Sequence, residues 1–299
     1  MEILEIQKVD LTSFCYLNKG RYPFLLESVN HNENNRYSIL FAFPGDNIVL
    51  KNFSDFDFLK ELQDKSKSTI LDSELPFIGG WFVYLSYELI GQIESTLASK
   101  LHKSTLPIAY AVQVPSAIIV DHKLDKTFII DQDNNQSRIN SILSDIKLLN
   151  KTPTQRIKGS QSEEVENKFI DGVKSSLDYI VAGDVFQVNL SRKWQYRLTE
   201  TTDSAIIYNA LKKANPAPFS ALIQYENFSI ISSSPERLFS VNDKTLETRP
   251  IAGTHPRGKG DLDKTQKNNL INHPKEIAEH VMLLDLERND MGRVCEYGS

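Results

Sequence analysis

Residues 219–233 read FSALIQYENFSIISS, and this stretch decides the fold class of the chain. Two runs of strand-forming residues, 219–225 and 228–233, flank the turn-forming pair Glu226-Asn227, which predicts an antiparallel hairpin. A second hairpin is predicted at 237–241 and 245–249, around the turn at 242–244. Upstream, residues 203–214 predict a helix that ends before the prolines of the NPAP segment. Helices combined with antiparallel hairpins indicate an α+β fold.

The segment before these elements predicts another helix and strand. Ser160 and Glu163 have the spacing of a capping box, and the apolar residues that follow recur every three or four positions until Gly183. Residues 186–198 then alternate between apolar and polar and predict a strand. Gln187 and Asn189 open its polar face, which is suited to binding a ligand.

The first half of the chain is rich in predicted strands. Short apolar runs at 23–29, 36–43, 112–121 and 127–131 predict strands, 75–91 predicts a buried strand with a short helix after it, and 55–65 and 137–149 predict helices. Residues 150–162 are polar and contain both Pro and Gly, which is typical of a linker. We therefore expect an N-terminal region at 1–150, a linker at 151–162 and a second domain at 163–299.

Composition excludes several classes of protein. The chain has 299 residues with 34 basic and 39 acidic side chains, a net charge of −5, and no basic patch of the kind that binds nucleic acid. Its two cysteines, Cys15 and Cys295, are far apart and suggest neither a disulfide framework nor a thiolate zinc site. The N-terminus does not resemble a signal peptide, and no apolar run reaches 18 residues. We expect a cytoplasmic protein without a membrane segment.

Two segments carry residues suited to catalysis. Glu236 lies between two predicted strands, and a loop containing Gly253 and Thr254 follows. A carboxyl group beside exposed backbone amides and a hydroxyl can act as a general acid, although Glu236 can equally pair with Arg237 or Arg249 on the surface.

A predicted helix beginning near Pro274 carries the second set of candidates. Glu276 and Glu279 lie three residues apart on one face, where two carboxylates can hold Mg²⁺, or can form an ordinary solvated acidic face. Ile277, Val281 and Leu284 are expected to form the buried stripe of this helix.

Taken together, these segments resemble the chorismate-utilising enzymes, a family that includes component I of anthranilate synthase and of aminodeoxychorismate synthase. The resemblance rests on five motifs in order: QVNLSRKW (187–194), NPAPFSALI (215–223), SSSPERL (232–238), ETRPIAGTHPRG (247–258) and KEIAEHVMLLDLERNDMGRV (275–294). LLES (25–28), RYS (36–38) and LPFIGGWFVYLSYEL (75–89) match the N-terminal region of the family more loosely.

The resemblance implies a fold, a cofactor and residue roles. The fold would be a large two-sheet antiparallel sandwich flanked by helices. Glu279 would ligate Mg²⁺ with assistance from Glu276, and Glu236 would protonate the departing 4-hydroxyl of chorismate. Ala252, Gly253 and Thr254 would line the ring, and Gln187, Asn189 and Arg249 would complete the substrate site. A glutamine amidotransferase partner would supply ammonia.

The product is less directly implied than the family. QVNL, APFSA and SPERL are more similar to aminodeoxychorismate synthases, and this folate-pathway activity is our first expectation. Ala252 stands where many of those enzymes carry a lysine and where anthranilate synthases carry alanine, so anthranilate synthase is the alternative. Glu27, Ser28, Asn215 and Pro216 match the tryptophan pocket of the family, although Ser28 can simply end a strand.

The last expectation concerns the C-terminus. The chain ends at Ser299, just after the RNDMGRV motif, whereas family members continue through further strands and helices that carry active-site residues. From this we expect the C-terminal part of the catalytic domain to be missing. A non-catalytic chorismate-binding protein is the further alternative.

Overall fold

The computed structural model describes residues 1–30, 35–66, 73–101 and 104–299, and its centre is an antiparallel sheet of seven strands. The strand order is β1-β8-β7-β3-β2-β11-β12. These strands are β1 (Glu2–Ile6), β2 (Phe24–Glu27), β3 (Tyr37–Ala42), β7 (Ser116–Asp121), β8 (Lys126–Asp131), β11 (Phe219–Tyr225) and β12 (Phe228–Ser234). β11 pairs with β2, with Ser220 opposite Glu27, so strands from both sides of the expected linker share one sheet.

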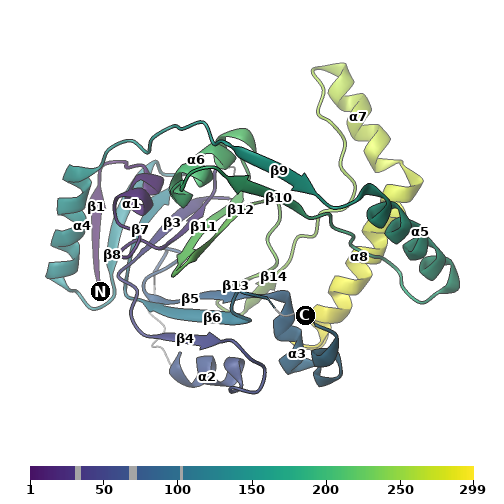
Figure 1. Ribbon diagram of the computed structural model, residues 1–299, viewed down its shortest axis with the longest axis horizontal. Coiled ribbons are helices and arrows are strands. Elements are labelled where there is room, and N and C mark those ends of the chain that lie inside the picture. The colour runs from purple at the N-terminus through teal and green to yellow at the C-terminus, as the bar shows by residue number, and fades with distance from the viewer. Residues whose placement is uncertain (31–34, 67–72, 102–103) are drawn as a thin grey trace.

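Three helices cover one face of this sheet (Figure 1). They are α1 (Leu11–Leu17), α4 (Gln136–Leu148) and α6 (Ser204–Ala214). Phe14, Ile142 and Tyr208 reach from these helices into a core that also contains Leu25 and Leu222 of the sheet. Burial of such side chains is worth about 1.5–3 kcal/mol each, which makes this layer a main source of stability.

The opposite face packs on a second, three-stranded sheet of order β4-β6-β5. Its strands are β4 (Asn47–Leu50), β5 (Gly80–Leu85) and β6 (Ala109–Val114). Phe24 of the large sheet stacks on Phe82 of the small one with ring centroids 4.2 Å apart, and Phe41 meets Phe82 edge to face at 5.3 Å. Helix α2 (Phe58–Lys65) contributes Phe58 to a further core cluster with Ile48 and Leu50 of β4.

Seven of the elements after residue 158 are far more exposed than the sandwich. They are β9 (Gly159–Glu163), α5 (Glu166–Ala182), β10 (Trp194–Leu198), β13 (Ser240–Asn242), β14 (Thr245–Glu247), α7 (Asp261–Ile271) and α8 (Pro274–Gly292). Among the described residues β9 pairs only with β10, and β13 only with β14. Helices α5, α7 and α8 lie to one side of the sandwich in Figure 1, and none of the three contains a buried residue. The short helical turns η1 (Tyr87–Leu89), α3 (Ile90–Ile93) and η2 (Ser95–Lys100) follow β5.

The predicted α+β sandwich of antiparallel sheets is confirmed, with three local corrections. Ser160 does not cap a helix but lies in β9 opposite Arg197, and α5 begins after Val165 without a side-chain cap. Residues 186–193 form no strand, because β9 offers hydrogen-bonding partners only to residues 194–198.

The third correction concerns helix α8. Its predicted buried stripe is exposed, with Ile277, Val281 and Leu284 at 45%, 58% and 50% exposure. In the described part of the chain no element packs over that face. The division of the chain at 151–162 stays a prediction.

Candidate active site

Helix α8 carries two carboxylates on its more sheltered face. Glu276 and Glu279 are half-buried, whereas their neighbours Lys275, Ile277 and His280 are exposed. Pro274 occupies the first turn, where its missing N–H costs no hydrogen bond, so the sequence starts the helix at the position that presents these carboxylates. The amide dipoles of a first helical turn also favour a negative charge at Glu276.

The loop at residues 249–258 lies against this helix start. Gly253 packs so closely on Glu276 that a β-carbon at position 253 would collide with the Glu276 carboxylate. Nearby, the rings of His255 and His273 meet edge to face with centroids 6.3 Å apart. The structure therefore brings the predicted ring-lining loop and a predicted metal ligand into direct contact.

Ion pairs fix this loop at both ends. Arg249 Nη2 lies 3.7 Å from Glu247 Oε2 at the start. At the other end Arg257 donates to Asp263 at 2.6 and 2.8 Å, and the Gly258 N–H donates to the same carboxylate at 3.0 Å. The hydrogen bond from Arg257, with that from Gly258, lowers the pKa of Asp263 to about 2. Sequence reasoning missed this anchor because it did not predict α7.

Glu236 is exposed in the turn between β12 and β13. Its backbone contacts Ser234, whose hydroxyl donates to the Glu236 carbonyl at 3.0 Å. The sequence left open a surface ion pair between Glu236 and Arg237. In the structure Arg237 instead donates to Glu247, at 3.2 Å.

The remaining predicted substrate residues differ in exposure. Gln187 and Asn189 are exposed in the irregular segment between α5 and β10. Ala252 is half-buried and Thr254 exposed, on either side of Gly253. The pairing of His255 with His273 was not anticipated, and no spacing signal in the sequence joins two residues 18 positions apart.

The expected tryptophan pocket combines two segments that the sheet brings together. The Val29 N–H donates to the Ala217 carbonyl at 3.1 Å, which ties the end of LLES to the segment of Asn215 and Pro216. The polar groups of Ser28 are already bonded, with the hydroxyl donating to the Tyr37 carbonyl at 2.8 Å and the N–H to Ser38 Oγ at 3.0 Å.

The side chain of Glu27 instead contacts helix α6. The Tyr208 hydroxyl donates to Glu27 Oε2 at 2.7 Å, and Lys212 Nζ donates to both carboxylate oxygens at 3.1 and 3.2 Å. Burial, and then the nearby Glu27 charge, raises the pKa of Tyr208 well above its ordinary range. Glu27 is therefore engaged by its own chain, and its contacts indicate a structural role.

The donor set on α8 fits a hard divalent cation. Within the ranges that the structure describes, no group of three or more His, Cys, Asp or Glu side chains gathers as a complete metal cage. Mg²⁺ commonly binds through one or two carboxylates and takes its other ligands from water and substrate. Two half-buried carboxylates one helical turn apart match that requirement.

Comparisons with known proteins identify the family of the chain. The family model described as chorismate binding enzyme matches residues 21–299. The chain is 32% identical to an anthranilate synthase component I-like protein of Synechocystis over 95% of its length, and 36% identical to aminodeoxychorismate synthase component 1 of Bacillus subtilis over 79%.

A solved structure matches as well. Anthranilate synthase component I of Streptococcus pneumoniae superimposes with a TM-score of 0.75 and 27% identity over 90% of the chain. The chain spans 64% of that protein, 59% of the Synechocystis protein and 53% of the Bacillus protein. In the described residues no helix has the length and apolar character needed to cross a bilayer.

Proposed function

The chain belongs to the chorismate-binding enzymes, and from that premise we propose that it is the chorismate-aminating component of an aminodeoxychorismate synthase. The observation that carries the proposal is the packing of Gly253 on Glu276, which joins the PIAGT loop to the carboxylate face of α8. The motifs QVNL, APFSA and SPERL and the 36% identity to the Bacillus protein support this product.

The proposed reaction replaces the 4-hydroxyl of chorismate with an amino group. Glu236 would donate a proton to that hydroxyl, the C–O bond would break with loss of water, and a C–N bond would form with ammonia. Gly253 and Thr254 would face the ring, while Gln187, Asn189 and Arg249 would bind its substituents. Because Ala252 has no amine, ammonia itself has to attack the ring.

Glu279 and Glu276 are the residues that would hold Mg²⁺. When bound, the cation would neutralise a chorismate carboxylate and thereby help to hold the substrate. The residues of the chain would do the rest: Gly253 keeps side-chain atoms away from the Glu276 carboxylate, and the ion pairs of Arg249 and Arg257 fix the loop ends.

Ammonia would come from a glutamine amidotransferase partner. Tryptophan would lie where Ser28 meets the segment of Asn215 and Pro216, and Glu27 would support this pocket through its bonds to Tyr208 and Lys212. We also propose a cytoplasmic location, which the two free thiols Cys15 and Cys295 support.

A second candidate function is anthranilate formation. Ala252 supports it, and so does the 27% identity to the anthranilate synthase component I structure. Because the chain spans about two thirds of that protein, chorismate binding without turnover is the third outcome that an assay has to distinguish.

The test is to incubate the purified chain with chorismate, Mg²⁺ and ammonium and to identify the products by mass spectrometry. Aminodeoxychorismate, converted to 4-aminobenzoate by an added lyase, is the expected product. Anthranilate with pyruvate would replace our proposal with the second candidate. Chorismate binding without product would leave only the binding role.

Matched variants then test the residue roles. Glu279→Gln is expected to weaken Mg²⁺-dependent chorismate binding on the order of 10–100-fold. Glu287→Gln is the control, because Glu287 is also half-buried on α8 but lies two turns beyond Glu279. Equal effects of the two variants would contradict the assignment of the metal site.

A further inference from the structure

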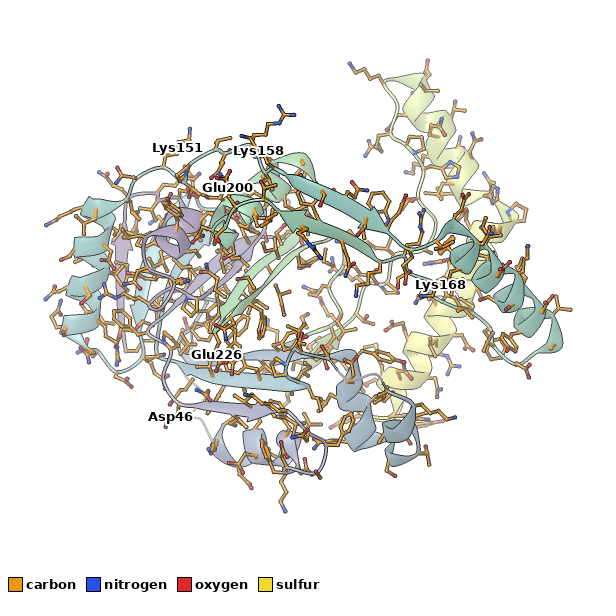
Figure 2. The ribbon with its side chains drawn as sticks, in the orientation of Figure 1. Asp46, Lys151, Lys158, Lys168, Glu200 and Glu226 are labelled. Atoms are coloured by element: carbon orange, nitrogen blue, oxygen red, sulfur yellow. The ribbon has the colours of Figure 1, made fainter. Side chains whose placement is uncertain are left out.

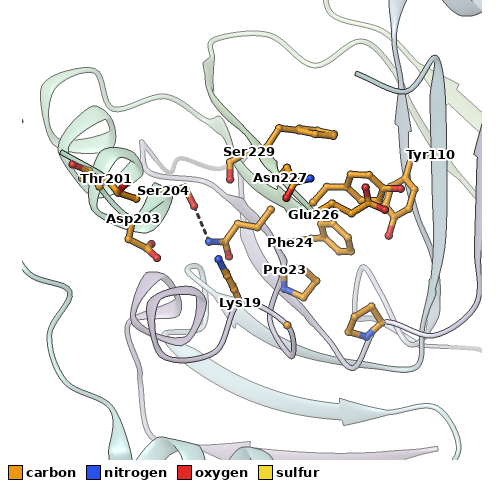
Figure 3. A pocket seen from close by; sticks show the side chains of 16 residues that line it. Lys19, Pro23, Phe24, Tyr110, Thr201, Asp203, Ser204, Glu226, Asn227 and Ser229 are labelled. Atoms are coloured by element: carbon orange, nitrogen blue, oxygen red, sulfur yellow. Dashed lines mark hydrogen bonds between the residues drawn. The ribbon is translucent and has the colours of Figure 1, made fainter. Parts of the chain in front are cut away.

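A cavity of about 730 Å³ lies at the end of the β11–β12 hairpin and shares no residue with the candidate active site. Its walls come from the turn after α1, the start of β2, strand β6, the start of α6 and the hairpin (Figure 3). Both sheets and both halves of the chain therefore build it. Its volume falls within the range of small-molecule sites.

One side of the cavity is aromatic. Tyr110 and Tyr225 meet edge to face with ring centroids 4.5 Å apart, and Phe228 lies 5.1 Å from Tyr225. Phe24, which belongs to the buried core between the sheets, adds a ring 6.0 Å from Tyr110. Phe24 and Tyr110 are buried, at 1% and 6% exposure, and they support the partly exposed rings of Tyr225 and Phe228. The latter two rings offer a preformed surface on which another ring can stack.

Opposite charges line the cavity. Lys19 makes no ion pair within the described residues, and Asp203, which caps α6, accepts the Ala205 N–H at 2.8 Å. Glu226 sits at the hairpin turn (Figure 2), and burial, then the Glu226 charge and a side-chain hydrogen bond with Glu226, raise the pKa of Tyr225. In Figure 3 Lys19 and Ser204 lie toward one end and Glu226 and Tyr110 toward the other.

The wall beside Lys19 is polar and not fully satisfied. The Gln224 side chain donates from Nε2 to Ser204 Oγ at 2.7 Å, while its Oε1 has no hydrogen-bond partner. Exchanging the positions of Oε1 and Nε2 would not remove this problem. Ser204 Oγ would then donate to Oε1, and Nε2 would be the atom without a hydrogen-bond partner. A buried amide atom without a partner costs about 1–3 kcal/mol, which is unusual in a wall that serves only packing.

We propose that this cavity binds a small aromatic carboxylate that bears an N–H donor on the opposite side of its ring. The carboxylate pairs with Lys19, the ring stacks on Tyr225, and the donor bonds to the Glu226 carboxylate. A ligand with only one of these groups pairs with only one of the two charges. The inference rests on the cavity alone and does not depend on the proposed reaction.

The experiment titrates the whole chain with 4-aminobenzoate by calorimetry, beside two truncated probes. Benzoate lacks the donor and aniline lacks the carboxylate. We expect saturable binding of 4-aminobenzoate at or below about 1 mM and binding of each truncated probe weaker by on the order of tenfold. Absence of saturable binding, or equal binding of benzoate, would overturn the proposal.

Two variants locate the bound probe. Lys19→Met and Glu226→Gly should each weaken 4-aminobenzoate binding on the order of tenfold. Glu226 has φ of 41°, a conformation that glycine adopts without strain, so its removal does not threaten the fold. The matched control is Lys123→Met, an exposed lysine outside the cavity.

Binding that survives both cavity variants would place the probe elsewhere and refute the assignment. Chorismate turnover, measured in the same variants, is expected to stay unchanged. A failure of the proposed reaction would therefore appear in the turnover assay and leave the binding result intact.

Discussion

Replacing Glu27 by glutamine tests whether this residue serves the fold or a ligand. Glu27 and Lys212 lie 3.1 Å apart, with side chains only 16% and 15% exposed. Glutamine still accepts the Tyr208 hydroxyl but leaves the Lys212 ammonium with only its longer ion pair to Asp10, at 3.8 Å. Breaking one side of a fully buried pair costs about 3–5 kcal/mol, and the residual exposure here places the expected loss at about 2–3 kcal/mol.

The assay is equilibrium urea denaturation without tryptophan, followed by circular dichroism. The control is Glu61→Gln, because Glu61 and Lys65 are also 3.1 Å apart but are 42% and 49% exposed. That exposed pair should contribute less than about 1 kcal/mol. A double variant, Glu27→Gln with Lys212→Met, removes both charges of the buried pair and should cost about 2 kcal/mol less than the sum of the single variants.

Two results would refute this reasoning. A loss for Glu27→Gln no larger than that for Glu61→Gln would mean that the Lys212 pair does not stabilise the fold. Strict additivity in the double variant would mean that the two charges do not interact. Either result would return Glu27 to the role of a tryptophan ligand.

Three further predictions concern the rest of the molecule. Burial opposes ionisation of Asp121, but hydrogen bonds from Arg36 and from two backbone amides outweigh it and hold the pKa of Asp121 below its ordinary value. The free energy of unfolding should therefore fall as the pH drops below about 4, and pH titrations should show a smaller fall in Arg36→Met. Burial raises the pKa of the Cys15 thiol far above its ordinary value. A thiol reagent at pH 8 should therefore modify only the partly exposed Cys295 in the folded chain, and both thiols in urea. Modification of both thiols without denaturant would contradict the burial of Cys15. Phe82→Ala removes a ring stacked between the two sheets and should cost about 3–5 kcal/mol in urea denaturation, whereas a loss below about 1 kcal/mol would place the sheet interface elsewhere.

Much of the fold followed from local patterns. The β11–β12 hairpin was predicted because strand-forming residues flank Glu226-Asn227, and α4 and α6 because their apolar residues recur with helical period. The prediction of a strand at 186–193 is wrong. An alternating pattern shows which face of a strand would be apolar, but not whether another strand lies beside it to form backbone hydrogen bonds. The predicted burial of the apolar stripe of α8 is wrong for a related reason, because periodicity cannot show that another element covers the stripe.

The sequence nominated candidate site residues but not the contacts between them. The motifs marked Gly253, Glu276 and Glu279, yet the 22 residues between Gly253 and Glu276 contain α7, which no pattern had predicted. Only the folded chain shows that Gly253 meets Glu276 and that Arg257 pairs with Asp263.

The sequence by itself determined the family, through five ordered motifs, and the α+β class, through hairpin and helix periodicities that are local properties of the chain. Only the tertiary structure decided that β2 pairs with β11, that Glu27 serves Lys212, and that the turn after α1 meets the hairpin of Glu226 in one cavity. The physical reason is that each of these contacts joins residues more than 150 positions apart. Their proximity depends on how whole sheets and helices pack, which no local spacing encodes.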